Sequence, residues 1–235
     1  WDLLWHSASL ACMNEGGASY GLIENGAIAV KDGEIAWLGR VSELPGPPES
    51  LAKEVCEAHG HCITPGLIDS HVHPVAGDFT PRQSQLNWID SSMHGGVTTM
   101  ISAGEVHYPG RPRDPEGVVA LAITAQRAFS AFPVGGVKVH GGAPVLEKGM
   151  EEEHFRRMAE QGVKLLGEVG LGTVKAGDEA KKMVDWARKY GIQSTIHTGG
   201  PSIPGSGLID AEVVLEAGAD IIGHINGGHT SLPHN

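Results

Sequence analysis

From about residue 63 to the end of the 235-residue chain, short apolar runs alternate with segments of helical periodicity. Each apolar run is short enough for one strand, and each helical segment is long enough for a crossover connection. Such alternation predicts a parallel sheet with helices on its outside. The six predicted strands lie in CITPGLIDSHVH, GVTTMISAG, GGVKVH, GVKLLGEVG, IQSTIH and ADIIGHI.

Six strand–helix units in order favour an α/β fold of the TIM-like (β/α) barrel type. A closed barrel has eight strands, so we expect an incomplete barrel over residues 65–235, truncated before strands 7 and 8. The clearest helix is DEAKKMVDWARKYG, which places apolar side chains on one face between Asp178, a predicted N-cap, and Gly191, a predicted stop. Asp210 is predicted to cap the next helix.

Residues 1–64 have the rhythm of β structure. In AIAVKDGEIAWLG, alternating apolar residues flank Asp32-Gly33, a pair that favours a two-residue hairpin because both turn positions need positive φ. A Pro-rich connection follows at residues 44–50, then a short helix or strand. We predict that this segment is part of a small β-sandwich.

Thirteen histidines are present, and several end apolar runs, where an imidazole is costly without a partner. His71 and His73 end the first predicted barrel strand, and a spacing of two directs both rings to the same side. Glu168, His197 and His224 lie near the ends of the fourth, fifth and sixth predicted strands. An isolated HxH is usually incidental, and a single strand-end histidine is usually a satisfied core residue. Five such groups at the functional end of one barrel predict a metal site.

Neutral imidazoles favour Zn²⁺ or Fe²⁺ over Mg²⁺ or Ca²⁺. Glu168 has two oxygens, so it can bridge two ions, one held by His71 and His73 and the other by His197 and His224. Water bound between such ions has a pKa lowered toward about 7, which supplies hydroxide to attack a carbonyl.

Other side chains are candidates for substrate contact or catalysis. Lys138 and His140 alternate on the third strand and point to one side, and for His140 a structural hydrogen bond is an equal alternative. Arg82 or Arg111 can clamp a carboxylate by a bidentate pair, although a solvated loop arginine is the simpler interpretation of each. The remaining predicted substrate contacts are His107 and Asn226.

The formal net charge of −11 argues against nucleic acid or anionic membranes as partners. Three cysteines, Cys12, Cys56 and Cys62, form no CxxC and no even framework, which favours a reduced, cytoplasmic setting. We expect neither a membrane span nor a signal peptide. No GxSxG lies on a predicted strand-to-helix elbow, so a serine-hydrolase triad is not indicated.

TPGLIDSHVH and the later strand-end histidines resemble the amidohydrolase superfamily. Within it, residues from about 65 to 230 resemble the enamidases, which open a cyclic amide in nicotinate fermentation. The similarity is carried by GDFTPRQ, HGGVTTMISAG, HYPGRPRD, GVKVHGGAPVLEKG, GEVGLGTVK, HTGGPSIPGS and HINGG. The resemblance implies a binuclear centre of Zn or Fe bridged by Glu168, hydrolysis of a C–N bond by metal-bound hydroxide, and a homo-oligomer.

Two departures leave alternatives open. The first 65 residues, with WDLLWHSASLACM and YGLIENGAIAVKDGEIAWLG, look more like imidazolonepropionases of histidine degradation. In addition, the family's last ligand, an aspartate ending strand eight that also moves protons, is expected beyond Asn235. The alternatives to an enamidase-like hydrolase are therefore an imidazolonepropionase-like hydrolase and a catalytically silent metal-binding fragment.

Overall fold

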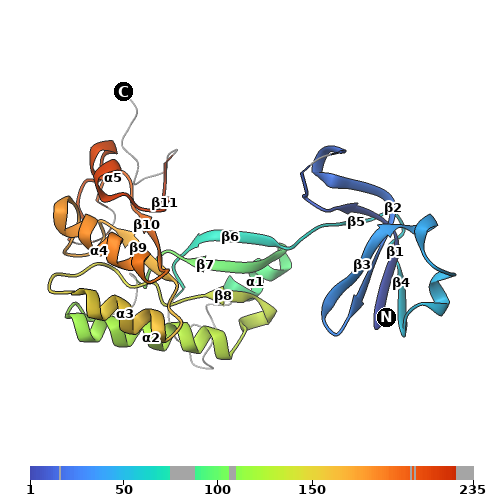
Figure 1. The fold of residues 1–235 in the computed structure, drawn as a ribbon, viewed down its shortest axis with the longest axis horizontal. Helices are drawn as coiled ribbons and strands as arrows, with labels where there is room; N and C mark the ends of the chain where they lie inside the picture. The colour runs from blue at the N-terminus through green and yellow to red at the C-terminus, as the bar shows by residue number, and fades with distance from the viewer. Residues whose placement is uncertain (16, 75–87, 106–109, 202, 204, 226–235) are drawn as a thin grey trace. The chain divides into compact units, whose positions relative to one another are not determined.

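The structure is a computed structural model that describes residues 1–15, 17–74, 88–105, 110–201, 203 and 205–225. The chain divides into two compact units, an N-terminal unit of Trp1–Gly66 and a C-terminal unit of Leu67–Asn235 (Figure 1). Each unit is described separately below. Among the helices within the described ranges, none is long and apolar enough to cross a membrane.

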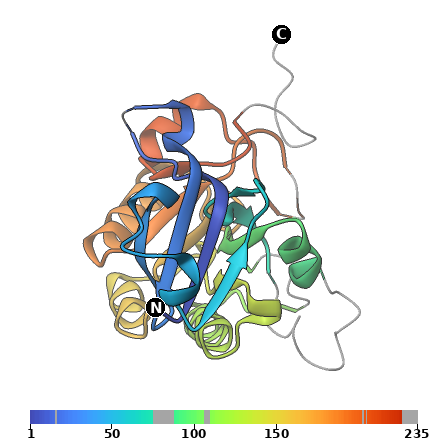
Figure 2. The same cartoon turned by 90° about the vertical axis from the view of Figure 1, so that its right-hand side faces the viewer.

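The N-terminal unit is built on one five-stranded sheet of order β3-β2-β1-β4, with β5 also paired to β1. Figure 2 is viewed from the side of this unit and shows its long strands β1 and β2 side by side. Asp32 and Gly33 both have positive φ and connect β2 to β3, which confirms the predicted hairpin. The described residues of this unit form a single sheet, so the sandwich stays a prediction. The strands are β1 (Leu3–Ala11), β2 (Leu22–Lys31), β3 (Glu34–Arg40), β4 (Glu54–Glu57) and β5 (Cys62–Ile63), and the short 3-10 turns are η1 (Ser19–Gly21), η2 (Val41–Glu43) and η3 (Pro48–Ser50).

The predicted first barrel strand, CITPGLIDSHVH, is two strands in the structure. Its first part is β5, which pairs in parallel with β1 of the N-terminal unit. Its second part is β6, which begins at Leu67 in the C-terminal unit. Thr64, Pro65 and Gly66 separate the two, because Pro65 has no backbone N–H to offer a sheet.

The C-terminal unit alternates strands and helices, and all its strand pairs are parallel, as expected of an α/β fold. Six strands follow one another in the predicted order, each inside its predicted segment. They are β6 (Leu67–Val72), β7 (Val97–Ser102), β8 (Lys138–His140), β9 (Leu165–Val169), β10 (Gln193–Ile196) and β11 (Ile221–Ile222). The helices are α1 (Trp88–His94), α2 (Pro115–Ala131), η5 (Val134–Gly136), α3 (Glu152–Glu160), α4 (Gly177–Lys189) and α5 (Ala211–Ala217).

These six strands form two three-stranded sheets, β6-β7-β8 and β11-β10-β9, rather than one ladder. The chain after β8 passes between the ends of β7 and β9: the Ala143 carbonyl accepts from Glu105 N at 3.4 Å, and the Pro144 carbonyl accepts from Gly167 N at 2.8 Å. Glu168 N also donates directly to Ala103 O at 2.8 Å, so the carboxyl ends of β7 and β9 are hydrogen-bonded to each other. Within the described residues, no ladder joins β8 to β9.

The main core packs helices against β9 and β10, and its cluster of buried side chains comes from α2 to α5 (Figure 1). The apolar face predicted for α4 is fully inside this core. The predicted Asp178 cap is wrong, because α4 begins at Gly177 with Ala176 as N-cap, so Asp178 lies in the first turn, where a negative charge suits the helix dipole. The Asp210 cap of α5 is confirmed by its bond from Val213 N at 3.1 Å.

Candidate metal centre

Strand ends bring the five predicted ligands together. His71 lies on β6 and His73 just after it, Glu168 on β9, His197 directly after β10 and His224 shortly after β11. Backbone hydrogen bonds align these ends: Glu168 N donates to Ala103 O, His197 N to Val169 O, and Gly223 N to Ile196 O. Because parallel strands present their carboxyl ends at one edge, residues up to 153 positions apart meet there.

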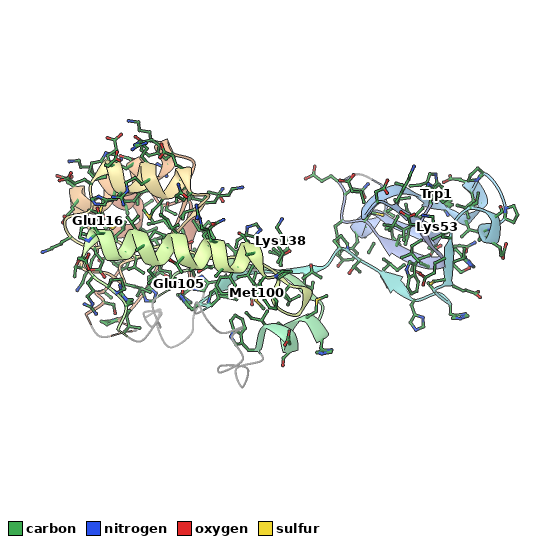
Figure 3. The ribbon with its side chains drawn as sticks, turned by 90° about the horizontal axis from the view of Figure 1, so that it is seen from below. Trp1, Lys53, Met100, Glu105, Glu116 and Lys138 are labelled. Atoms are coloured by element: carbon green, nitrogen blue, oxygen red, sulfur yellow. The ribbon has the colours of Figure 1, made fainter. Side chains whose placement is uncertain are left out.

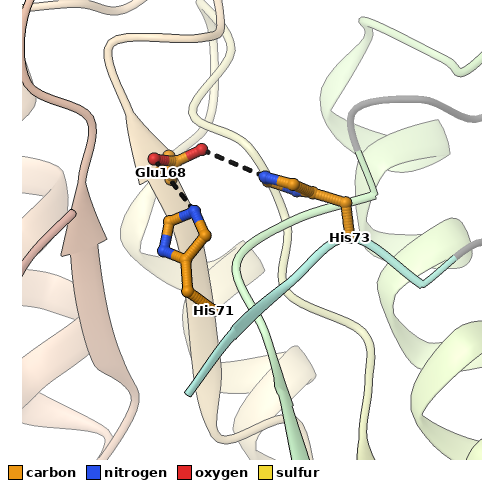
Figure 4. A group of neighbouring side chains, drawn as sticks. All are labelled: His71, His73 and Glu168. Carbon is orange, nitrogen blue, oxygen red and sulfur yellow. Dashed lines mark ion pairs between the residues drawn. The ribbon is translucent and has the colours of Figure 1, made fainter. Parts of the chain in front are cut away.

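The Glu168 carboxylate is the centre of the cluster and is only 1% exposed. Its Oε2 lies 3.3 Å from His73 Nε2, and its Oε1 lies 3.5 Å from His71 Nε2 (Figure 4). The same Oε1 lies 3.2 Å from His197 Nδ1 and 3.1 Å from His224 Nε2. One carboxylate therefore contacts all four imidazoles.

The ligand atoms form two sets that share Glu168. One set contains His71, His73 and Glu168, the other Glu168, His197 and His224, and within each set the atoms lie within 4.8 Å of one another. Two ligands of a tetrahedral zinc ion at about 2.1 Å each would be separated by about 3.4 Å. The nitrogen–oxygen distances of 3.1 to 3.5 Å fit that separation. The buried His71 Nε2 has no hydrogen-bond partner in the described parts of the chain, as expected of a nitrogen reserved for a cation.

Backbone carbonyls orient two of the rings. His73 Nδ1 donates to Gly104 O at 2.9 Å, and His197 Nε2 donates to Gly200 O at 3.1 Å. These bonds select the nitrogen that faces Glu168, which is Nε2 in His73 and Nδ1 in His197. Gly223 permits the close packing, since a Cβ there would lie 3.0 Å from Glu168 Oε1. Gly223 is next to His224 and Gly200 is in the loop after His197, so their positions in the sequence could have indicated a role; Gly104 follows β7, which carries no candidate ligand.

Two opposing effects set the pKa of Glu168. Burial raises the pKa of the carboxyl group. Hydrogen bonds from His197 and His73 and the charge of His71 outweigh burial and lower the pKa to about 2. Glu168 is therefore ionised at neutral pH, as a metal-bridging carboxylate must be.

The histidines differ in their protonation. Burial lowers the pKa of His71, which favours the neutral form that binds a cation. Burial also lowers the pKa of His73 and His197, but the hydrogen bonds to Glu168 and to a backbone carbonyl outweigh it and raise both. A cation at His197 Nδ1 would displace the proton held between that nitrogen and Glu168, so metal binding is coupled to proton release.

The remaining predicted site residues fall into two groups. Arg82, His107 and Asn226 lie outside the described residues. Lys138 and His140 lie on β8, and among the described residues neither forms a hydrogen bond or ion pair with Glu168. Burial and the charges of Lys138 and Lys164 lower the pKa of His140.

Arg111 is held in a buried ion pair that the sequence analysis did not anticipate. Its Nη1 donates to Glu147 Oε1 at 2.8 Å, with the two side chains 8% and 0% exposed. The other oxygen of Glu147 accepts from the Thr173 backbone at 3.0 Å and from its hydroxyl at 2.6 Å. The pair joins the loops after β7, β8 and β9, so the role of Arg111 as a substrate clamp stays a prediction.

Comparison with known proteins identifies relatives that match between half and nine tenths of the chain. No model of a protein family matches it. An enamidase from Eubacterium barkeri is 46% identical over 211 residues, which cover 90% of this chain and 54% of that enzyme. An imidazolonepropionase from a Shewanella species is 42% identical over 140 residues, covering 52% of this chain and 34% of the relative. The chain thus spans about half the length of the enamidase, and the predicted similarity to both enzymes is confirmed.

Comparison with solved structures also identifies enamidase. The crystal structure of enamidase, described as a new member of the amidohydrolase superfamily, superposes with a TM-score of 0.85 at 43% identity, over 97% of this chain and 58% of that one. Molinate hydrolase, at 14% identity and a TM-score of 0.59 over 94% of this chain and 57% of that one, shares the fold alone. The chain is therefore homologous to enamidase, which its crystal structure describes as a member of the amidohydrolase superfamily.

Proposed function

We propose that the protein is a metal-dependent hydrolase of a C–N bond in a small cyclic amide, with two divalent ions, Zn or Fe, bridged by Glu168. The observation that carries the proposal is the single buried carboxylate shared by two sets of imidazoles. The similarity to enamidase over nine tenths of the chain supports a cyclic amide as the substrate class.

His71 and His73 would hold one ion, His197 and His224 the other, with Glu168 between them. Bound divalent ions supply a hydroxide at neutral pH and polarise the carbonyl that it attacks. The carbonyls of Gly104 and Gly200 keep the rings of His73 and His197 in the orientation that presents a nitrogen to the centre. In the overall reaction water adds to the amide carbon, the ring C–N bond breaks, and the nitrogen takes up a proton.

Proton movement and substrate contact need further side chains. His140 and Lys138 are proposed for catalysis, and Arg82, His107, Arg111 and Asn226 for substrate binding. The homo-oligomer expected from the resemblance is likewise a proposal.

The first test is metal analysis of the protein purified without added metal, with Glu168→Ala as the variant. Because Glu168 belongs to both sets, we expect about two equivalents of Zn or Fe in the wild type and a sharp decrease in the variant. Glu179→Ala is the matched control, since this exposed glutamate in the first turn of α4 should leave metal content unchanged. Metal near zero in the wild type would remove the basis of the proposal.

The second candidate is hydrolysis of an imidazolone ring, favoured by the similarity to imidazolonepropionase. Turnover of six-membered unsaturated lactams and of imidazolone propionate by the metal-loaded protein separates the two. We expect turnover of the lactam and none of the imidazolone. A protein that binds two metals and turns over neither ring would be the silent metal-binding form.

A further inference from the structure

A second feature of the C-terminal unit is a cavity of about 360 Å³ between α2, β8 and the beginning of β9. The cavity lies where no ladder joins β8 to β9 in the described residues. Beyond β8 the chain returns to β9, because the Pro144 carbonyl accepts from Gly167 N. None of its lining residues is a candidate metal ligand. Its volume lies within the range of about 300–1,000 Å³ usual for small-molecule sites.

One part of the cavity wall is basic. Lys138, His140 and Lys164 all line it. The charges of both lysines lower the pKa of His140, so all three side chains lie within electrostatic reach of one another. Neither lysine side chain forms an ion pair or hydrogen bond within the described residues, and no carboxylate lines the cavity. Both lysines are exposed, and the positive potential of their two ammonium groups would attract an anion bound at this wall.

The rest of the wall is mixed, with the polar side chains of Gln126 and Ser130 beside apolar ones. Phe129 of α2, Val139 of β8 and Leu165 of β9 line it, and Lys138 lies beside the end of α2 (Figure 3). Gly141 allows α2 to approach, because a Cβ there would lie 2.3 Å from the Phe129 ring. A ligand with an apolar body and one anionic group matches these two kinds of wall.

We propose that this cavity is a second binding site, separate from the metal ligands, for a small organic carboxylate with an apolar ring or chain. The carboxylate lies between Lys138 and Lys164, and the apolar body packs against Phe129, Val139 and Leu165. No metal ligand takes part in this site, but Lys138 and His140 line it. Lys138 therefore has a ligand-binding role in place of the catalytic role proposed above.

The test is calorimetric titration of the metal-loaded protein with benzoate, with benzamide as the neutral probe of equal shape and acetate as the anion without an apolar body. We expect benzoate to bind, acetate to bind more weakly and benzamide not to bind. Lys138→Met and Lys164→Met should each weaken benzoate by about tenfold, because each removes one charged partner. Lys182→Met, on the exposed face of α4, is the matched control and should bind benzoate as the wild type does.

Carboxylates also coordinate divalent metals, so the titration is repeated on Glu168→Ala. Retained binding in Glu168→Ala, lost in the Lys138→Met/Lys164→Met double variant, supports the cavity. Circular dichroism of each variant checks its fold, and amide shifts of Gly141 and Gly162 on adding benzoate report the location. No benzoate binding by the wild type, or full affinity in the folded double variant, would overturn the proposal.

Discussion

Arg111 and Glu147 form a buried ion pair, 2.8 Å between Nη1 and Oε1, that connects loops 36 residues apart in the sequence. Arg111 follows β7, Glu147 follows β8, and the Thr173 that donates to Glu147 follows β9. The pair therefore ties together the loops after these three strands, and β9 is the strand that carries Glu168.

Breaking this pair should destabilise the protein strongly. Arg111→Met leaves the Glu147 charge buried without its partner, which costs about 3–5 kcal/mol in free energy of unfolding. Urea denaturation measures the loss. Arg157→Met removes an exposed pair with Glu116 and should leave the midpoint nearly unchanged, so equal effects of the two variants would contradict the assignment.

Replacing one candidate ligand at a time should lower the metal content of one set and leave the other set loaded. His71→Asn and His197→Asn each affect one set, so each should lower metal content by about one equivalent, whereas Glu168→Ala lowers both. Metal analysis of the three variants under one purification checks this. A loss of both metals from His71→Asn alone, with the fold intact, would contradict two separate sets.

Asp220 should make the free energy of unfolding depend on pH in the acidic range. Burial raises the pKa of Asp220, but bonds from the Ser194 backbone and hydroxyl, each 2.8 Å, and from Arg188 lower it overall below the ordinary value of 3.8. A carboxyl whose folded pKa is lowered stabilises the fold above its unfolded pKa, and this contribution disappears as pH falls through the folded pKa.

Asp220→Asn should therefore cost about 1 kcal/mol near neutral pH. The difference from the wild type should shrink as pH is lowered below about 4. Denaturation at a series of pH values measures this difference. A difference that stays constant from pH 7 to pH 2.5 would show that Asp220 does not act through its charge.

Gly142 should resist substitution for two separable reasons. Its φ is +78°, and a Cβ would lie 2.3 Å from the Ala122 carbonyl of α2. Gly142→Ala should destabilise by about 1 kcal/mol through backbone strain and by a further 1–3 kcal/mol through overpacking. Gly177→Ala is the matched control, because φ there is +74° with no atom within 4 Å, so only the strain should be measured. Equal losses would show that the contact with α2 carries no cost.

The sequence alone determined the elements that local chemistry controls. Asp32-Gly33 makes its hairpin because both residues accept positive φ, and Asp210 caps α5 because its carboxylate reaches a backbone N–H three residues on. The clustering of the candidate metal ligands was predictable too, since the HxH spacing puts His71 and His73 on one side and parallel strands share one functional edge.

Only the tertiary structure decided what depends on distant partners. Which nitrogen of His197 faces Glu168 follows from the Gly200 carbonyl, and the pairing of Arg111 with Glu147 follows from the packing of three loops. No ladder joins β8 to β9 in the described residues, and a cavity lies there beside Lys138 and Lys164. The chain after β8 instead bonds to Glu105, beyond β7, and to Gly167 of β9. No local periodicity encodes such contacts, because they join segments brought together by folding.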